Sequence, residues 1–591
     1  MFLKNKKDGF GLLEVLLGIG LLVIFTGGIY FAFNSILISL RTSRALITAT
    51  ELLNDRAEFI RNLSYASIGT QGGIPAGNIL PTEQITRSGD TFMIQTTVRN
   101  IDDPFDGTLG GVPNDTAPAD YKLIELHVTC VTCPPNVSAS ITVRAAPAGL
   151  ETTGDNGALF IIVSDANVQP VAGANIVVAN SSTIPNILIS DVTNADGMLQ
   201  LVDAPTSTES YRVTVTKSGY SSEQTYPPGD PANPNPVQPH GNVSTGLVTK
   251  IYFYIDKLSA VTLNTNDYFC NAIPDVGYTL SGTKLIGTNP DPDLNVKKYN
   301  TTSTTDGNGT KVLSLEWDIA YYLSVNDVNY NFEGVAPYDQ GAFPVAPSTT
   351  ITKRLIVSTA NPAALQLAVY DATTSVPLDE ALITLEGSTS TSAITGHRLV
   401  TDTNWAAGNY SSKDESINTD SLPGSIILQL VTSTYPTDGP HWLIGNTIDF
   451  GSNAAGAFSI DWTPQSQPVN TDVKFQIATN NDNASWNFVG PDGTASTFYM
   501  SSSTLNAIHQ NNRYLRYKVF LTTNDEIVTP RVDDITFDFM GGCIPSGQIL
   551  KNGLATGIYT LTVSRAGYAT FSTSTSVDYN YQRVGVGLFG L

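Results

Sequence analysis

Apolar residues follow two different periods along this chain, and the change comes near residue 65. No charge interrupts the sequence from Val15 to Leu40, which is longer than the roughly 20 residues that a membrane-spanning helix needs. Beyond it, apolar residues recur near helical spacing, with charges between them: Leu46, Leu52, Leu53, Phe59, Ile60 and Leu63. The pattern predicts one helix over residues 10–64, with a membrane span at 15–40 and its remainder packed on a small sheet.

Alternation of apolar and polar residues replaces the helical period after residue 65. Residues 92–98, 122–129 and 139–144 alternate in this way, so we expect an antiparallel sheet within a head of residues 65–150. Short alternating stretches separated by Gly, Pro and Asn then continue to the C-terminus, which is typical of antiparallel β-sandwiches.

Three segments of this β region repeat a common order of features. Each has a proline-containing turn before an alternating strand and a later strand led by tyrosine, and the first two share an Asp-Gly turn. They predict sandwiches at residues 158–258, 259–360 and, in two pieces, 361–401 plus 541–591. Residues 402–540 carry strands of their own and predict a jelly-roll-like sandwich inserted in a loop of the third repeat.

Charge and composition narrow the functional classes. The 591 residues include 53 acidic and 31 basic ones, and the net charge of −22 disfavours general nucleic-acid binding because such a surface repels phosphate. With 41% hydrophobic residues the chain can build cores and is not a disordered acidic tail. Five histidines and four cysteines are too few for histidine- or cysteine-rich metal sites.

The N-terminus places a carboxylate where a plain membrane anchor would not. Three lysines precede Gly9 and Phe10, and Glu14 lies inside the apolar stretch, where a lone carboxylate costs about 2.5–3.5 kcal/mol. An ordinary secretory signal has its cleavage residue after the apolar core, whereas Gly9 stands before it. The basic leader favours a cytoplasmic N-terminus with the rest of the chain exported.

Gly9, Phe10 and Glu14 resemble the class III signal of type IV prepilins and pseudopilins. The resemblance implies that prepilin peptidase cuts after Gly9, removes a leader of residues 1–9 and leaves an N-methylated Phe10. It also implies that the Glu14 carboxylate pairs with the Phe10 amine of a neighbouring subunit in the apolar core of a filament. The proline that is common in the helix of mature major pilins is absent here.

Two further resemblances cover the rest of the chain. The order of long helix, short linker and strands, with IRNLSYASIGT and DYKLIELHV, is similar to that of minor, V-type pilins. The repeats resemble the carboxypeptidase regulatory-like, or Cna B-type, transthyretin-like domain, whose modules are stalks, spacers or adhesive units without peptidase activity. The positions that carry this likeness are Pro170, Gly173-Ala174, Asp196-Gly197, Tyr211 and Gly219-Tyr220; Asp306-Gly307 and Tyr321; Pro377, Tyr559 and Gly567-Tyr568.

The insert has strand runs similar to those of jelly-roll, galactose-binding-like modules, some of which bind sugars. Four of its aromatic residues would stack on a sugar if they were exposed, although their strand spacing fits a core better: Trp442, Trp462, Trp486 and Tyr499.

The head holds a second set of ligand candidates in a Gly- and Pro-rich loop: Asp102, Asp103, Asp106, Asp115 and Asp120. Carboxylates on a flexible loop suit calcium, but the spacing is not that of an EF-hand, and a solvated loop with Asx-turns explains the same residues.

The four cysteines allow three disulfide pairings in an exported protein. Cys130 and Cys133 can form a local bond only if the chain turns between them. Cys270 and Cys543 each precede an Ile-Pro and would mark equivalent strand starts in the second and third repeats. A bond between those two modules is the attractive long-range pairing.

No enzyme signature emerges from the remaining chemistry. The five histidines are dispersed, no GxSxG elbow precedes a helix, and GYTLSGTK reads as a β-turn rather than a phosphate loop. We therefore expect a protein that is not an enzyme.

Together these features predict a minor pilin or pseudopilin: mainly β, with a long N-terminal transmembrane α-helix, a pilin-like α+β head, tandem transthyretin-like or Ig-like β-sandwiches and an inserted jelly-roll-like sandwich. It would span the cytoplasmic membrane once and then reach the cell surface in a type IV pilus-like filament. The expected partners are other pilins, prepilin peptidase, the assembly machinery and a surface glycan or protein ligand. Two alternatives stay open: a pseudopilin of a type II secretion or DNA-uptake system, and a membrane-tethered carbohydrate-binding protein.

One prediction concerns covalent cross-links. Some Cna B-type modules carry a Lys–Asn isopeptide bond, which needs a lysine in the first strand, but ALFIIVSD, LSAVTLNTN and LQLAVYD contain none. We therefore expect the intact mass of the purified protein to show no loss of ammonia from these modules. A deficit of one ammonia per module would contradict this.

Overall fold

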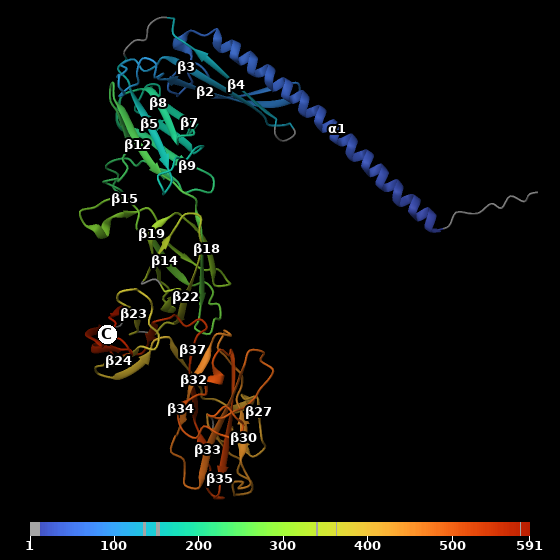
Figure 1. The fold of residues 1–591 in the computed structure, drawn as a ribbon, viewed down its shortest axis with the longest axis vertical. Helices are drawn as coiled ribbons and strands as arrows, with labels where there is room; N and C mark the ends of the chain where they lie inside the picture. Colours follow the sequence, from blue (N-terminus) through green and yellow to red (C-terminus); the bar gives the residue numbers. More distant parts are fainter. Residues whose placement is uncertain are drawn as a thin grey trace, which may run out of the picture. The chain divides into compact units, whose positions relative to one another are not determined.

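The computed structural model describes residues 12–133, 137–148, 154–338, 341–361, 363–422, 424–578 and 581–591, apart from the side chains of residues 14, 15 and 293. One long helix precedes a succession of β-sheets, so the fold is mainly β, as the sequence predicts (Figure 1). The chain divides into two units, residues 1–257 with 285–296 and residues 258–284 with 297–591.

Helix α1 (Leu12–Arg61) is buried only along one stripe of its C-terminal part. The buried positions recur every three or four residues, as one face of a helix requires: Ala45, Ala49, Leu52, Leu53, Ala57 and Ile60. Leu46 and Phe59, which fit the helical period of the sequence, are 45% and 48% exposed because they lie off this stripe. Three of the six residues in the stripe are alanines, whose small side chains allow the helix and the sheet to approach each other.

The helix packs on an antiparallel sheet with the strand order β1–β2–β3–β4. The 3-10 turn η1 (Tyr65–Ser67) follows the helix, and the strands are β1 (Thr82–Arg87), β2 (Asp90–Ile101), β3 (Tyr121–Cys130) and β4 (Ser138–Ala145). Phe92 and Ile94 of β2 and Leu126 and Val128 of β3 are buried in the core that they share with the helix. Strands β2, β3 and β4 contain the three alternating segments, and β1 adds an edge strand that the alternation did not indicate.

Three sandwiches share one topology, which is the structural basis of the sequence repeats. In each, the first and last strands pair in parallel: β5 with β12, β13 with β22, and β23 with β41. The fourth strand pairs antiparallel with the first strand on its other side: β8, β18 and β38. The second, third and fifth strands form the facing sheet.

The first sandwich belongs to the first unit. Its strands are β5 (Gly157–Ser164), β6 (Asn175–Asn180), β7 (Ile187–Val192), β8 (Met198–Ala204), β9 (Ser207–Thr216), β10 (Glu223–Gln224), β11 (Gly241–Val243) and β12 (Val248–Tyr254). Strand β15 (Leu285–Gly287) and the turn η2 (Pro292–Leu294) also belong to this unit, although the sequence assigned them to the second sandwich. The reason is that the Val237 amide donates to the Ile286 carbonyl at 3.0 Å and so holds this excursion on the long loop before β11.

The second sandwich opens the second unit. Its strands are β13 (Ser259–Asn266), β14 (Gly277–Gly282), β17 (Asn300–Thr304), β18 (Thr310–Leu315), β19 (Asp318–Val325), β20 (Tyr330–Ala336), β21 (Ala342–Val345) and β22 (Thr350–Thr359). Short β16 (Val296–Lys297) lies where the chain re-enters this unit.

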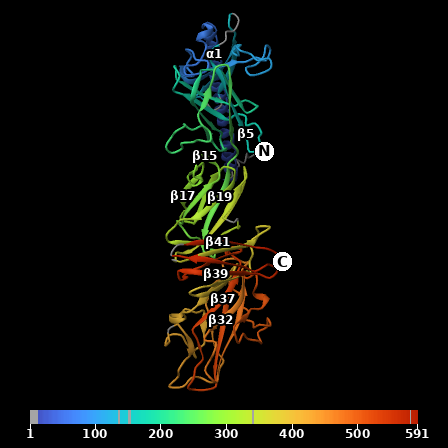
Figure 2. The same ribbon diagram turned by 90° about the vertical axis from the view of Figure 1, so that its left-hand side faces the viewer.

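The third sandwich, to which β39 and β41 in Figure 2 belong, is interrupted between its third and fourth strands. Its strands are β23 (Leu365–Asp371), β24 (Leu382–Glu386), β25 (Ser390–Ile394), β38 (Gln548–Lys551), β39 (Gly557–Ser564), β40 (Phe571–Val577) and β41 (Gln582–Leu588). The interruption is a separate sandwich with its own core. It begins at His397 rather than at 402, because β26 (His397–Asp402) pairs with β37 of the insert and not with the third sandwich.

The insert contains three sheets, ordered β26–β37–β32–β34, β27–β30–β35–β31 with β33 also on β35, and β28–β29–β36. The remaining bounds are β27 (Ser412–Lys413), β28 (Ile417–Asn418), β29 (Ile426–Leu428), β30 (His441–Ile444), β31 (Ile448–Asp449), β32 (Gly456–Thr463), β33 (Thr471–Asn480), β34 (Ser503–Thr504), β35 (Tyr514–Thr523), β36 (Arg531–Val532) and β37 (Asp534–Met540), with 3-10 turns η3 (Ala406–Gly408) and η4 (Ala507–His509).

A glycine stands at the same place in all three sandwiches, just before the fourth strand. Gly197, Gly309 and Gly547 have φ of 70°, 69° and 66°, and each carbonyl accepts a hydrogen bond from a first-strand amide at 2.7–2.8 Å. A Cβ on any of them would meet a first-strand carbonyl oxygen at 2.5–2.8 Å. In the second sandwich this glycine is Gly309, so the Asp306-Gly307 pair matched from sequence is two residues too early.

The tyrosines that lead the fifth strand also have one structural role. Tyr211, Tyr321 and Tyr559 are fully buried. Their hydroxyls donate to the carbonyls of Pro205, Glu316 and Ala555 at 2.6, 3.0 and 2.9 Å. Each tyrosine therefore joins the core to the preceding loop without leaving its hydroxyl unsatisfied.

The shared geometry of the glycine turn predicts the effect of a substitution at Gly547, and Gly553 of the same sandwich serves as the control. Gly547 and Gly553 have nearly equal φ, 66° and 68°, but nothing lies within 4 Å of a Cβ on Gly553. We expect Gly553→Ala to cost the left-handed strain alone, roughly 1–2 kcal/mol, and Gly547→Ala to cost clearly more because of the added clash with Val369. Hydrogen exchange of β23 and β39 amides in the full chain would measure both, and equal effects would refute the assigned role.

Candidate functional site

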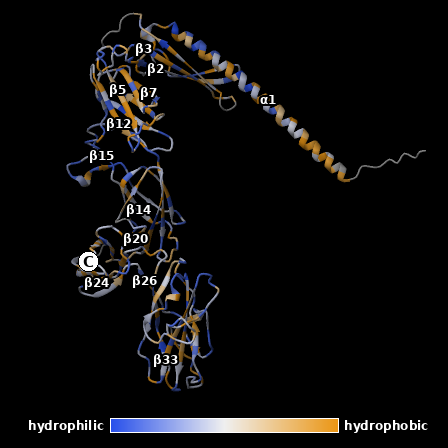
Figure 3. Ribbon diagram, viewed as in Figure 1, coloured by the Kyte–Doolittle hydropathy of each residue, from blue (hydrophilic) through white to orange (hydrophobic). Residues whose placement is uncertain are grey.

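The N-terminal part of α1 is an apolar surface that the described chain leaves uncovered. Large apolar side chains from Leu12 to Leu40 are 44–83% exposed. The ribbon of this part of α1 is largely orange, the colour of hydrophobic residues, in Figure 3. By length and composition this helix can cross a membrane. Gly9 and Phe10 lie outside the described residues; Glu14 lies in the first turn of α1, and its side chain is not described.

Ion pairs and one buried lysine fix the other part of α1 to the head. Arg56 of the helix pairs with Glu83 of β1, and Arg87 of β1 pairs with Asp55 of the helix at 2.7 Å. Two ion pairs therefore join β1 to the helix. Lys122 is 6% exposed and donates to the Tyr65 and Ile68 carbonyls at 2.8 and 2.6 Å, beyond the end of the helix. Burial lowers the pKa of Lys122, and these two carbonyls are the groups that satisfy its ammonium.

The head is attached to the first sandwich by a charged contact within the first unit. Arg99 donates to both carboxylate oxygens of Asp191 at 2.8 and 2.6 Å, and the Asp191 side chain is only 6% exposed. The Leu188 amide donates to the Gly72 carbonyl at 2.7 Å nearby. A bidentate pair of this kind fixes orientation as well as distance.

The aspartates of the head loop are used mainly by the loop itself. Asp102 accepts from the Leu109 amide at 2.9 Å, Asp115 accepts from the Ala117 amide at 2.8 Å, and Asp120 accepts from the Asp103 amide. Burial, followed by the charges of Asp115, Asp120 and Asp106, raises the pKa of Asp102. No three carboxylate oxygens of this described loop lie within 4.8 Å of one another, so the loop stays a calcium prediction without a formed ligand set.

Both cysteine pairs are disulfides, and they act at different scales. The chain bends after β3, which brings the Cα atoms of Cys130 and Cys133 to 5.5 Å and closes the end of the head sheet. Cys270 and Cys543 are 273 residues apart in sequence and 5.2 Å apart between Cα atoms. The second bond joins a loop of the second sandwich to the chain that leaves the insert.

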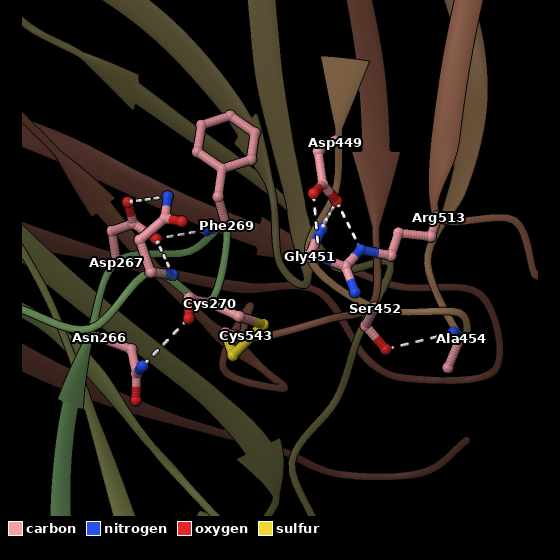
Figure 4. The surroundings of a disulfide bond; sticks show 11 residues. Asn266, Asp267, Phe269, Cys270, Asp449, Gly451, Ser452, Ala454, Arg513 and Cys543 are labelled. Atoms are coloured by element: carbon pink, nitrogen blue, oxygen red, sulfur yellow. Dashed lines mark hydrogen bonds and ion pairs between the residues drawn. A yellow bond between two sulfur atoms is a disulfide. The ribbon is translucent and has the colours of Figure 1, made fainter. Parts of the chain in front are cut away.

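A structured loop presents Cys270 to its partner (Figure 4). Asp267 accepts from the amides of Phe269 and Asn271 at 2.9 and 2.8 Å, which closes the loop around the cysteine. The Phe269 ring stacks on Phe539 of β37 with centroids 5.6 Å apart, and Phe539 stacks on Phe450 at 4.5 Å. The disulfide is therefore accompanied by an aromatic contact that continues into the core of the insert.

Two polar contacts that sequence reasoning missed join the second sandwich to the insert and to the third sandwich. Glu333 of the second sandwich and Arg398 of β26 form an ion pair at 2.9 Å, with side chains only 6% and 9% exposed. Gln548 of the third sandwich accepts from the Val335 amide at 3.2 Å and donates to the Val335 carbonyl at 2.9 Å. No sequence signal could have paired these residues, because their separations of 65 and 213 residues carry no periodicity.

The aromatic ligand candidates of the insert separate into two groups. Trp462 and Tyr499 are 2% and 1% exposed and belong to the core, so they cannot stack on a ligand. Trp442 and Trp486 are half-buried on the outer side, each with a cation over its ring. The cations, Arg516 and Lys518, were missed, although the alternation in YLRYKVF places them on the outward positions of a strand.

The histidines do not gather into one site. His397 lies 3.0 Å from Asp538 across β26 and β37, and His441 lies 3.1 Å from Asp414. His509 is buried, and burial lowers its pKa to about 4. These three lie on separate elements of the insert, and the expectation that the chain is not an enzyme stays a prediction.

No known protein-family profile matches the chain, and no curated protein is significantly similar to it. Solved structures similar to it include the Bacillus anthracis TIE protein, at 10% identity over 87% of this chain and 75% of that chain, with a TM-score of 0.15. The shaft pilin SpaA from Lactobacillus rhamnosus GG (12%, 35% and 100%, TM-score 0.15) and BcpA, the major pilin subunit of Bacillus cereus (9%, 74% and 100%, TM-score 0.14), are similar at the same level. Such low values support no inference about the activity of this chain.

The long-range disulfide gives a prediction for single-molecule pulling on the full chain from its two ends. While the bond is intact, force passes from Cys270 directly to Cys543, and the chain between them cannot extend. We expect complete unfolding to release about 95 nm less contour length than after reduction, from 273 residues at roughly 3.5 Å each. The Cys270→Ser/Cys543→Ser variant should show the long value without reductant, and a length independent of reduction would contradict the bond.

Proposed function

We propose that this chain is a minor pilin or pseudopilin, cut after Gly9 and assembled through α1 into a type IV pilus-like filament that displays its β-sandwiches for adhesion. The observation that carries the proposal is the division of α1. Its residues 45–60 pack on the chain's own sheet, whereas the apolar side chains of residues 12–40 have no cover among the described residues.

Such a surface needs an apolar environment both before and after assembly. A continuous exposed apolar helix is insoluble in water, and a bilayer covers it first because the segment is long enough to span one. In a filament, like helices from neighbouring subunits would replace the lipid. The glycines at 18, 20, 27 and 28 have nothing within 4 Å of a Cβ, so neighbouring helices can approach their backbones closely.

Glu14 would set the register of that assembly. An ionised carboxylate in an apolar bundle is stable only with a partner, and cleavage after Gly9 creates one, the amine of Phe10 on a neighbouring subunit. The helix alone does not require a glutamate in this position, so its presence favours an assembly that uses it.

The size of the exported part favours a rare or terminal position in the filament. Three sandwiches and an insert follow the head, which is more than a densely packed shaft accommodates at every subunit. The contacts at Arg99, Glu333 and Cys270 bind successive modules to one another within each unit, as a display structure requires. Adhesion is the function that suits such a part.

The alternatives differ in what the helix does. A pseudopilin of a type II secretion or DNA-uptake system would use the same helix but present its head to cargo, and the net charge of −22 disfavours DNA. A membrane-tethered carbohydrate-binding protein would keep its leader and remain in the lipid.

Two measurements on cells that carry the native assembly system test the proposal. Mass analysis of the mature N-terminus should find a chain that begins at methylated Phe10. Glu14→Val should reduce incorporation into sheared filaments at least tenfold while membrane levels persist, and Glu51→Val, at an exposed site of the same helix, should not. A mature chain that retains Met1, or full incorporation of Glu14→Val, would refute the filament role and leave the tethered alternative.

A further inference from the structure

The outer face of the insert carries a row of cations and aromatic rings that its core does not need. Along β35 the side chains of Leu515, Tyr517, Val519 and Leu521 are buried, so Arg516, Lys518 and Phe520 point to the other face. Trp442 of β30 lies directly opposite Phe520 in the register of the sheet. All four outward residues are half-buried rather than freely solvated.

Rings and cations alternate at contact distance across this face. Arg516 lies over the Trp486 ring at 4.3 Å, and Lys518 lies over Trp442 at 4.5 Å and over Phe520 at 5.0 Å. Phe498 meets Phe520 edge-on with centroids 5.2 Å apart. The face therefore offers flat apolar surfaces with positive groups held between them.

These two cations have no carboxylate partner among the described residues. The aspartates around them are engaged elsewhere: Asp472 by Lys474, Asp414 and Asp438 by His441, and Asp449 by Arg513. Arg516 donates only to the Thr447 hydroxyl, at 2.8 Å. Burial lowers the pKa of Lys518, so the fold holds an ammonium where it is partly desolvated and unpaired.

We propose that this face binds the carboxylate-bearing sugar units of an anionic polysaccharide. The sugar rings lie against Trp442 and Trp486, and the carboxylates accept hydrogen bonds from Lys518 and Arg516. The proposal rests on the display function proposed above and names the class of ligand that the displayed insert takes up.

Charge complementarity selects this ligand over a neutral glycan. A neutral glycan would use the rings but leave both cations unpaired, whereas a carboxylate satisfies them with charge-assisted hydrogen bonds. A nucleic-acid strand would also stack and would meet the same two cations, so an oligothymidylate is the competing ligand in the test.

Calorimetry on the full chain in detergent tests the proposal, with oligogalacturonate, hyaluronan and alginate fragments as probes. We expect at least one to bind, and methyl esterification of that probe to weaken binding about tenfold or more, because the charge-assisted bonds are lost. Arg516→Gln/Lys518→Gln, which removes both positive charges and keeps two methylenes of each side chain, should lose about as much. Lys250→Gln/Lys311→Gln makes the same change in net charge elsewhere and should bind as the unaltered chain does.

Trp442→Leu should also weaken binding, and unchanged thermal unfolding of each variant would show that the insert remains folded. Absence of binding to all three probes, equal binding by the Arg516/Lys518 variant, or tighter binding of an oligothymidylate would each overturn the proposal. Calorimetry measures binding on protein that is not assembled in a filament. A chain that binds the polysaccharide but never enters a filament would therefore support the ligand proposal and refute the filament role.

Discussion

The apolar side chains of α1 must leave water, and the chain itself buries only those beyond residue 44. This division gives the helix two tasks. Its C-terminal part anchors the head, through the alanine stripe, the ion pairs to β1 and the buried ammonium of Lys122. Its N-terminal part has no such partner in the described chain, so its burial depends on lipid or on other copies of the same helix. The β-sandwiches follow the head along the chain.

Beyond the head, three sandwiches repeat the same strand pairing and the same glycine turn. A first strand lies between the last strand and the fourth, and the turn that feeds the fourth strand must pass so close to the first that only glycine fits. The third sandwich accepts the insert at this turn and still keeps Gly547 in the left-handed region. A large module can thus be added without disturbing the sheet that carries it. The disulfide and the Glu333–Arg398 pair tie the insert and its exit to the second sandwich, and the Gln548–Val335 bonds tie the third sandwich to the second.

Local patterns predicted the elements well because they depend on neighbours in sequence. The uncharged run and the helical period indicated α1, and alternation indicated β2, β3, β4 and most sandwich strands. The sequence-based interpretation differs from the structure where contacts between separate parts of the chain decide the arrangement. Leu46 and Phe59 fit the helical period but lie off the packed face, which includes Ala45, Ala49 and Ala57, because hydrophobicity alone does not show which residues face the sheet. The insert begins at β26 rather than after it, because a strand's sheet is chosen by its pairing partner, here β37.

By itself the sequence determined the class of fold, the long helix and its uncharged segment, the repeats, the acidic balance and the unusual place of Glu14, since each is a property of residues close together in the chain. Only the tertiary structure decided which cysteines pair and that Trp462 and Tyr499 are core while Trp442 and Trp486 reach the outer face. It also decided that the two cations beside those rings find no carboxylate among the residues that the structure describes. These features depend on sheet register and on contacts between residues tens to hundreds of positions apart, and no local period records them.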